Sequence, residues 1–450
     1  MRNFLTVMLM VATVAFFIVP NMGCPPPTPP TNGDGTNGDG TNGDGTNGDG
    51  TNGDGTNGDG TNGGGTTGLT IVKTAIPVRH DAKLLCGNDL IAFGTETAGA
   101  TVGVSYIVPS TAPTVGTPVP NSELYSNKAF AVGGSTIFLA GINTASLAYQ
   151  VSVYDVPTAT MTQTFSTDEI RIGTTPVGAY DAGHIQADGN YCVVICDQST
   201  VTDGVILKVI DVSSGTPTLI PLTNNPASTH FQVDQVAVDG TTGTVVAAAN
   251  DTLYVYDIAN PTAAPTEIAV ANGIAENIQM AISGNYIIAV DDQGYTAAFL
   301  VDLSTNSVIT MTDAECVRNP AISSTVFAFH SNNSAEDTQT RIAVGTVPGP
   351  GFTKPAADQY IDGSTPNNGS VGYGSDVAIR PSGSHIFLSG AYLQYSTSGV
   401  SFVVPADPGG TDPYGCPAWK VDCSSNTVGF QTAAVTTSGT PKTVGYIILP

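Results

Sequence analysis

Short apolar runs separated by tight polar turns recur from about residue 69 to the end of the chain. Each recurring unit opens with two apolar runs joined by a turn, which is the pattern of a β-hairpin. The turns include Gly189-Asn190 and Gly284-Asn285, residue types that favour tight hairpin turns. Seven copies occur, spaced about 40–57 residues apart: KLLCGNDLIAFG (from Lys83), AFAVGGSTIFLAG (Ala129), IQADGNYCVVIC (Ile185), QVAVDGTTGTVVAAA (Gln235), QMAISGNYIIAV (Gln279), AISSTVFAFH (Ala321) and VAIRPSGSHIFLSG (Val377).

A third and a fourth apolar run follow several of these pairs. The third runs are VSVYDV (from Val151), LKVIDV (Leu207), LYVYDI (Leu253) and AFLVDL (Ala298), and the fourth runs are TLIPL (Thr218), TEIAV (Thr266) and SVITMT (Ser307). Four antiparallel strands per unit at this period is the layout of a β-propeller blade. We therefore expect an all-β fold, a β-propeller of seven four-stranded blades over residues 69–450, with eight blades as the alternative.

The two ends of this region bear on how the ring closes. LTIVKTAIPV, from Leu69, reads as a fourth strand without a unit of its own, so it could complete the last blade. WKVDCSSNTVGFQT, from Trp419, aligns with FLVDLSTNSVITMT, from Phe299, which predicts a third and a fourth strand. GVSFVVPAD (Gly399) also reads as a third strand and TVGYIILP (Thr443) as one more, so the register of the last blade stays open.

One stretch points to a family. LYVYDIANPTAAPTEIAV, from Leu253, resembles the LVIVD/YVTN-type, WD40-like propeller repeats of bacterial and archaeal surface proteins, in which a strand ends in Asp-hydrophobic-x-Asn-Pro. The match is close at Asp257–Pro261 and partial at VIDVSSGTP (Val209) and VYDVPTAT (Val153). The resemblance implies an extracellular β-propeller and assigns no chemistry.

The N-terminus has the features of an export signal. Arg2 precedes an apolar run from Phe4 to Val19, which is shorter than the roughly 20 residues of a membrane-spanning helix. The junction Gly23-Cys24 resembles the cleavage site of bacterial lipoproteins, although that family prefers leucine where Asn21 stands. The resemblance implies that residues 1–24 are a signal peptide, that Cys24 is lipidated, and that the protein is anchored at the cell surface or outer membrane.

Residues 25–68 contain no apolar segment that could form a core. PPPTPP favours a stiff extended chain, and the TNGDG copies that follow favour isolated turns. We expect a disordered linker whose mean reach is on the order of 35–40 Å. One aspartate per copy keeps such a tether soluble, and the copies lack the full ligand pattern of a calcium loop.

The net charge of the chain limits the classes of partner that we expect. Against 37 acidic residues there are 13 Lys and Arg, so the formal net charge is −24. A surface this acidic repels phosphate backbones, which excludes nucleic acid as an expected partner. A protein or glycan ligand remains open, and we expect a monomer.

Candidate chemical groups are few. The third-strand aspartates Asp155, Asp211, Asp257 and Asp302 are expected to accept N–H groups of the following turn, with a ring of calcium ligands as the alternative. Cys416 and Cys423 could form a disulfide in an exported protein. Cys192 and Cys196 would lie about 13 Å apart on one strand, too far to pair, and are expected to be buried thiols with Cys86 and Cys316.

No catalytic constellation is recognisable, since the five histidines are scattered and no nucleophile, zinc or phosphate-binding motif occurs. Long connections between second and third strands, at Thr95, Asp197, Ser331 and Ala391, would leave one face of the ring, where propellers bind partners. We expect a tethered binding or scaffold module without catalysis or cofactor. The alternatives are a calcium-assisted, lactonase-like propeller hydrolase and a purely structural envelope protein.

Overall fold

The computed structural model divides the chain into two units, residues 1–64 and 65–450, and only the second contains described residues. The structure describes residues 69–78, 83–96, 102–167, 185–196, 206–223, 235–249, 252–270, 278–291, 298–311, 318–332, 340–348, 352–353, 376–389, 392–397, 402–405, 418, 420–432 and 442–450. The predicted signal peptide, Cys24 and the repeat linker lie outside them. Among the described residues, no helix has the length and apolar character needed to cross a membrane.

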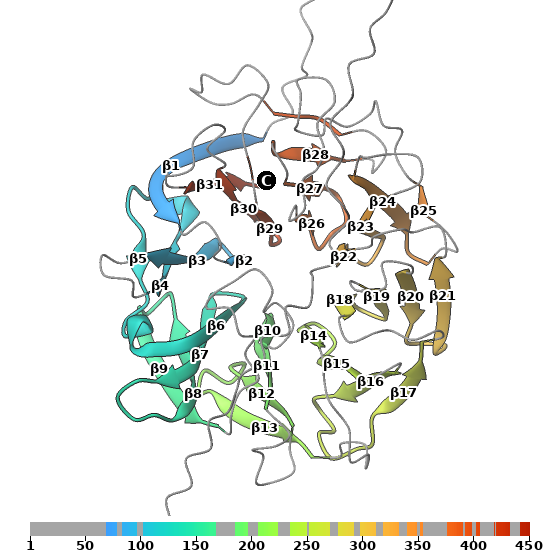
Figure 1. The fold of residues 1–450 in the computed structure, drawn as a ribbon, viewed down its shortest axis with the longest axis horizontal. Coiled ribbons are helices and arrows are strands. Elements are labelled where there is room, and N and C mark those ends of the chain that lie inside the picture. Colours follow the sequence, from blue (N-terminus) through green and yellow to red (C-terminus); the bar gives the residue numbers. More distant parts are fainter. Residues whose placement is uncertain are drawn as a thin grey trace, which may run out of the picture. The chain divides into compact units, whose positions relative to one another are not determined.

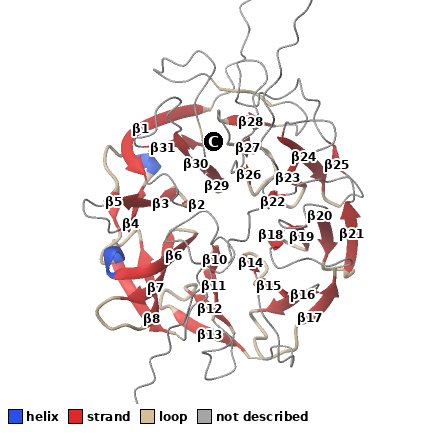
Figure 2. Cartoon of the chain, viewed as in Figure 1, coloured by secondary structure: helices blue, strands red, loops and turns tan. Residues whose placement is uncertain are grey.

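The described residues form eight antiparallel sheets, seven of four strands and one of three. The sheets are arranged around a common centre (Figure 1). We number the sheets as blades 1 to 8 by the first strand of each along the chain. The only helices described are two single 3₁₀ turns, η1 (Pro109–Thr111) and η2 (Ser122–Leu124), shown blue in Figure 2.

In blades 1 to 7 the strands run outward from the centre in chain order, and in blade 8 the last three described strands do so while the first described strand of the chain is outermost. The innermost strands are β2 (Leu84–Gly87), β6 (Tyr125–Gly133), β10 (Ile185–Asp188), β14 (Gln235–Asp239), β18 (Ile278–Ser283), β22 (Arg318–Ile322), β26 (Val377–Ile379) and β29 (Lys420–Cys423). The second strands are β3 (Leu90–Glu96), β7 (Thr136–Asn143), β11 (Tyr191–Ile195), β15 (Thr244–Ala249), β19 (Tyr286–Asp291), β23 (Val326–Asn332), β27 (Ile386–Leu388) and β30 (Thr427–Thr432).

The outer half of each blade is more varied in length. The third strands are β4 (Val102–Ile107), β8 (Tyr149–Asp155), β12 (Leu207–Asp211), β16 (Thr252–Asp257), β20 (Ala298–Asp302), β24 (Thr340–Thr346), β28 (Gln394–Ser396) and β31 (Lys442–Ile448). The fourth strands are β5 (Thr117–Pro118), β9 (Thr160–Ser166), β13 (Thr218–Leu222), β17 (Thr266–Ala269), β21 (Ser307–Met311), β25 (Phe352–Thr353) and, in blade 8, β1 (Thr70–Val78).

The ring is closed by contact between neighbouring innermost strands. Each of them contacts the innermost strand of the blade before and of the blade after, and β29 of blade 8 contacts β2 of blade 1. Eight apolar clusters of described residues lie one at each of the eight boundaries between consecutive blades. A single sheet would expose these side chains, so each blade depends on both neighbours for its core.

The expected β-propeller is confirmed, but the number of blades is eight and not the favoured seven. The eighth blade is built from the C-terminal segment. Its first hairpin pairs Lys420–Cys423 with Val428–Gln431, so the run from Trp419 supplies the first and second strands and not the third and fourth. β31 is the third strand, and β1 pairs with it antiparallel from Thr70↔Ile448 to Val78↔Lys442. The predicted closure by the segment from Leu69 is therefore confirmed.

Blade 7 explains why the last register was hard to read. The predicted connection at Ala391 contains its third strand, Gln394–Ser396. Val403, expected in a third strand, instead makes an isolated bridge to Tyr395 on the outer side of β28. The strands of this blade are three residues long, too short to show an alternating apolar pattern. The run from Trp419 was therefore assigned to this blade, although it begins the next one.

Candidate functional site

The innermost strands surround a cavity of about 520 Å³ at the centre of the ring. Eight charged or amide side chains of described residues line it, and seven of them lie within one residue of the start of a different innermost strand, the eighth being Asp422, further along β29. We call these seven the polar ring: Lys83, Gln186, Gln235, Gln279, Asn319, Asp376 and Lys420. No described side chain of blade 2 is among the lining residues of this cavity.

The polar ring arises from a local feature of each blade. An innermost strand is apolar where it packs between its two neighbours, but its first residues lie at the open end of the channel. Val236 and Val377 are buried, whereas Gln235 and Asp376, which precede them, are half-buried. Because the same position recurs in successive blades, single polar residues far apart in the chain gather at one end of the channel.

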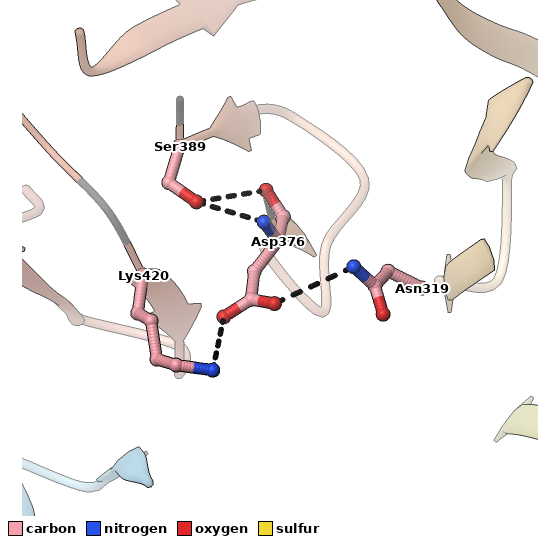
Figure 3. A network of polar contacts seen from close by, with 4 residues as sticks. All are labelled: Asn319, Asp376, Ser389 and Lys420. Carbon is pink, nitrogen blue, oxygen red and sulfur yellow. Dashed lines mark hydrogen bonds and ion pairs between the residues drawn. The ribbon is translucent and has the colours of Figure 1, made fainter. Parts of the chain in front are cut away.

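A continuous series of contacts links four consecutive blades along the polar ring. The Oε1 of Gln279 in blade 5 accepts the backbone N–H of Asn319 in blade 6 at 2.6 Å. The Nδ2 of Asn319 lies 3.5 Å from Oδ1 of Asp376 in blade 7, and Oδ2 of Asp376 lies 3.9 Å from Nζ of Lys420 in blade 8. Figure 3 shows the last three residues directed toward one another.

Ser389, directly after the second strand of the same blade, fixes the backbone of Asp376. The Oγ of Ser389 accepts the backbone N–H of Asp376 at 2.8 Å and lies 3.5 Å from the Asp376 carbonyl oxygen (Figure 3). The backbone N–H of Ser389 also donates to that carbonyl, at 3.0 Å. Burial raises the pKa of Asp376 above its usual range, while the charge of Lys420 and a hydrogen bond from the Val421 N–H act in the opposite direction. Because the carboxylate is partly shielded from water, its ionisation costs free energy.

Lys420 lies in a partly buried basic region at the junction of blades 8 and 1. Its residue is 8% exposed, as is Lys442 at the start of β31. Burial, and then repulsion from Lys420, lower the pKa of Lys442 to about 8. The two ammonium groups therefore influence each other across blade 8.

A second acidic group lies one layer deeper in the channel. Asp422 Oδ2 accepts the backbone N–H of Cys86 at 2.7 Å, and its Oδ1 accepts the N–H of Cys423 at 2.9 Å. Burial raises the pKa of Asp422 to about 6, and these two hydrogen bonds oppose the shift. The neighbouring charge of Asp376 adds to the increase and that of Lys83 reduces it.

The opposite end of the channel, where the first hairpins turn, is stabilised differently. There a carboxylate of one blade accepts a backbone N–H of the next, as Asp188 does from Gly240 at 2.7 Å and Asp239 from Gly284. A smaller cavity of about 400 Å³ lies among the turns of blades 1, 2, 3, 7 and 8. Asp188 and Asp239 bond to backbone N–H groups of the next blade, whereas Asp376 of the polar ring contacts side chains and lines the larger cavity.

The third-strand aspartates do not form a ligand set. Asp155, Asp211, Asp257 and Asp302 each accept a backbone N–H from their own following turn, donated by Thr158, Ser213, Ala259 and Ser304 at 2.8–3.1 Å. The structural interpretation of these residues is confirmed. Within the part of the chain that the structure describes, no three His, Cys, Asp or Glu side chains are grouped as metal ligands would be.

The structure tests some of the cysteine predictions and leaves others untested. Cys192 and Cys196 are buried thiols, as expected, and Cys86 is a half-buried one beside Asp422. The Sγ of Cys423 lies 3.1 Å from the carbonyl oxygen of Ser424. Cys416 lies outside the described residues, as do Cys24 and Cys316, so lipidation of Cys24 and a Cys416–Cys423 disulfide stay predictions.

The predicted binding face coincides with the polar ring. Second strands end where innermost strands begin, as Phe93 pairs with Leu84 in blade 1, so connections to the third strands leave from the polar end of the channel. The connecting residues 97–101, 197–205 and 333–339 lie outside the described residues. Binding at this face stays a prediction, and the polar ring was not predicted from the sequence.

The chain matches no family model and no curated protein sequence. Similar solved structures include a mitotic checkpoint complex, at 12% identity over 72% of this chain and 90% of that one, with a TM-score of 0.45. AztD of Citrobacter koseri is similar at 8% identity over 61% of this chain and 70% of that one, with a TM-score of 0.43. The Cps50 (Swd1) β-propeller domain of Myceliophteria thermophila matches at 10% identity over 85% of this chain and 100% of that one, with a TM-score of 0.41.

Proposed function

We propose that this β-propeller is an exported, lipid-anchored binding module whose ligand site is the polar end of the central channel. The observation that carries the proposal is the polar ring, in which seven of the eight blades place a polar side chain around one cavity of about 520 Å³. That volume lies within the roughly 300–1,000 Å³ typical of small-molecule sites.

The Asp376–Lys420 pair supports a binding role over a stabilising one. Charge-assisted N–H···O hydrogen bonds are about 2.7–2.9 Å long, whereas this pair is separated by 3.9 Å. Partly buried charges at such a distance lose hydration without gaining a strong hydrogen bond. A ligand that bonds to both groups would compensate each of them.

The N-terminal sequence supports export and anchoring. The positive Arg2, the apolar run to Val19 and Gly23-Cys24 have the order of a lipoprotein signal, and the TNGDG copies would hold the propeller clear of a membrane. The repeats are proposed to be of the LVIVD/YVTN type on the basis of Asp257–Pro261. Expression of the full chain in a bacterial host with labelled palmitate should label the protein, and Cys24→Ser should abolish the label. Equal labelling of both proteins would contradict the anchor.

A ligand screen on the full-length protein in detergent tests the binding site. Ligand-detected NMR against sugars, amino acids, nucleosides and small carboxylates should identify binders whose signals weaken in Asp376→Asn. Binders unaffected by Asp376→Asn and by Lys420→Met, in proteins that retain their circular dichroism spectra, would place recognition elsewhere and overturn the proposal.

A calcium-assisted hydrolase is the second candidate, because Asp376, Asp422 and several amide oxygens line the same cavity. Lys420 opposes it, since an ammonium group 3.9 Å from Asp376 competes with a cation for that carboxylate. Titration calorimetry with calcium, followed by turnover of lactone and ester substrates, separates the two candidates. Tight calcium binding together with calcium-dependent turnover would establish the hydrolase. A purely structural envelope protein would bind none of these probes.

A further inference from the structure

We infer that the polar ring recognises an uncharged, hydroxyl-rich ligand, a mono- or disaccharide, centred on Asp376, Asn319 and Lys420. This inference rests on the proposed function and names the ligand class of the same site.

The charges of the described lining residues balance. They comprise two lysines, Lys83 and Lys420, and two aspartates, Asp376 and Asp422. Each lysine lies close enough to an aspartate to influence it, Lys420 at 3.9 Å from Asp376 and Lys83 through its charge on Asp422. Among these described residues, a charged ligand group would meet a like charge beside each opposite one, so they favour neither a strongly anionic nor a strongly cationic ligand.

The hydrogen-bonding groups match hydroxyls. A hydroxyl donates one hydrogen bond and accepts two, so it is best recognised where acceptors and donors lie side by side. Asp376 supplies acceptors, Lys420 supplies donors, and the Asn319 amide between blades 6 and 7 supplies both. The contacts of Asp376 with these neighbours are long, 3.5 and 3.9 Å, and the hydrogen bond from the Val421 N–H occupies only one of the roughly four lone-pair sites of a carboxylate, so lone pairs remain for a ligand.

The amides of the polar ring extend this chemistry around the channel. Gln186, Gln235 and Gln279 line the same cavity from blades 3, 4 and 5. They face a wall that contains small apolar residues, among them Ala281, Ala321 and Ala378. Small residues leave space beside the polar groups, and an apolar wall suits the C–H faces of a sugar ring.

Binding to the full-length protein tests the inference. Glucose, galactose, N-acetylglucosamine, maltose and lactose would be compared with glycine, serine and glutamate by saturation-transfer NMR and calorimetry. At least one saccharide should bind, and Asp376→Asn should weaken it about tenfold or more, because the amide replaces one acceptor with a donor. Lys420→Met should also weaken it.

Asp302→Asn is the matched control, since it makes the same change at an exposed turn between β20 and β21. It should leave saccharide affinity unchanged. Binding of an amino acid that depends on Asp376, without any saccharide binding, would overturn the ligand class and leave the proposed site standing. Saccharide binding that is equal in Asp376→Asn, Lys420→Met and the unaltered protein would overturn the inference. Failure of every saccharide to bind at 10 mM, about the weakest affinity worth assigning to a site, would also overturn it.

Discussion

Asp422 and Cys86 lie 336 residues apart in the chain, yet Oδ2 of Asp422 accepts the backbone N–H of Cys86 at 2.7 Å. The first residue belongs to the innermost strand of blade 8 and the second to that of blade 1. This hydrogen bond therefore spans the point where the ring closes. The pairing of β1 with β31 likewise joins the first and last strands of the described chain, but in the outer part of blade 8.

The pH dependence of stability should report on Asp422. Its pKa is raised to about 6 in the folded protein, from an ordinary value of 3.8, so the folded state retains a proton that the unfolded chain releases. The stabilisation by this proton is present below about pH 4 and is lost as the pH rises through about 6. Two pKa units correspond to about 3 kcal/mol, an upper value for this half-buried group.

Asp422→Asn should remove that dependence. The amide can accept only one of the two N–H groups, so the variant carries a pH-independent loss of about 1–3 kcal/mol. Urea unfolding between pH 4 and pH 7 measures both effects. The free energy of unfolding of the unaltered protein should fall toward that of Asp422→Asn as the pH rises. Parallel curves for the two proteins across this range would contradict the assigned shift.

Gly240→Ala should destabilise the junction of blades 3 and 4. An added Cβ would lie 2.4 Å from the Asp188 carbonyl oxygen and 2.9 Å from the Gly189 nitrogen, both backbone atoms that cannot move independently. We expect a loss of about 1–3 kcal/mol. Gly103→Ala is the control, because the nearest atoms to its Cβ would lie at 3.5 Å, and its unfolding midpoint in urea should shift little. Equal stability of the two variants would refute the close approach.

Asp376 and Lys420 should be only weakly coupled in stability. A double-mutant cycle of Asp376→Asn and Lys420→Met should give a coupling energy below about 1 kcal/mol, because the groups are 3.9 Å apart beside a cavity that can admit water. Denaturant unfolding of the four proteins provides the measurement. A coupling energy above about 2 kcal/mol would show that the pair stabilises the ring, which would weaken the argument that it is retained for a ligand.

The architecture was predictable because each blade repeats the same order of short apolar runs, which predict its strands. The aspartate-ended runs at Val151, Leu207, Leu253 and Ala298 contain the third strands β8, β12, β16 and β20. Each blade is covered on both faces by its neighbours, so its third strand must be largely apolar, and such a run is easily recognised. The run from Trp419 was assigned to third and fourth strands because Val421-Asp422 resembles the aspartate-ended third strands, whereas it forms the first two strands of the eighth blade.

The polar ring was present in the sequence but could not be distinguished from ordinary surface positions. Two of the seven hairpin copies begin with Gln, at Gln235 and Gln279, and one begins with Lys83. A single polar residue before an apolar strand is unremarkable alone, and only the ring brings these positions together. Counting back five residues from the turn glycines gives Gln235 and Gln279, but Gln186 lies only three residues before Gly189, so a fixed spacing does not find every member. The contact of Asp376 with Lys420 required the corrected register of blades 7 and 8.

Closure of the eight-bladed ring is tested most directly by a cross-link between its two ends. Thr70 of β1 lies opposite Ile448 of β31, and directly opposed residues of antiparallel strands have Cα atoms about 4.5–5.5 Å apart, within disulfide reach. In Lys73→Cys/Ile448→Cys the pair is offset by three residues, about 10 Å along the strand. Under mild oxidation, mass spectrometry of peptides digested without reductant should find the intramolecular 70–448 disulfide in Thr70→Cys/Ile448→Cys, and no 73–448 disulfide in the offset pair. A 70–448 yield no higher than that of the offset pair, or only intermolecular links, would contradict the closed ring.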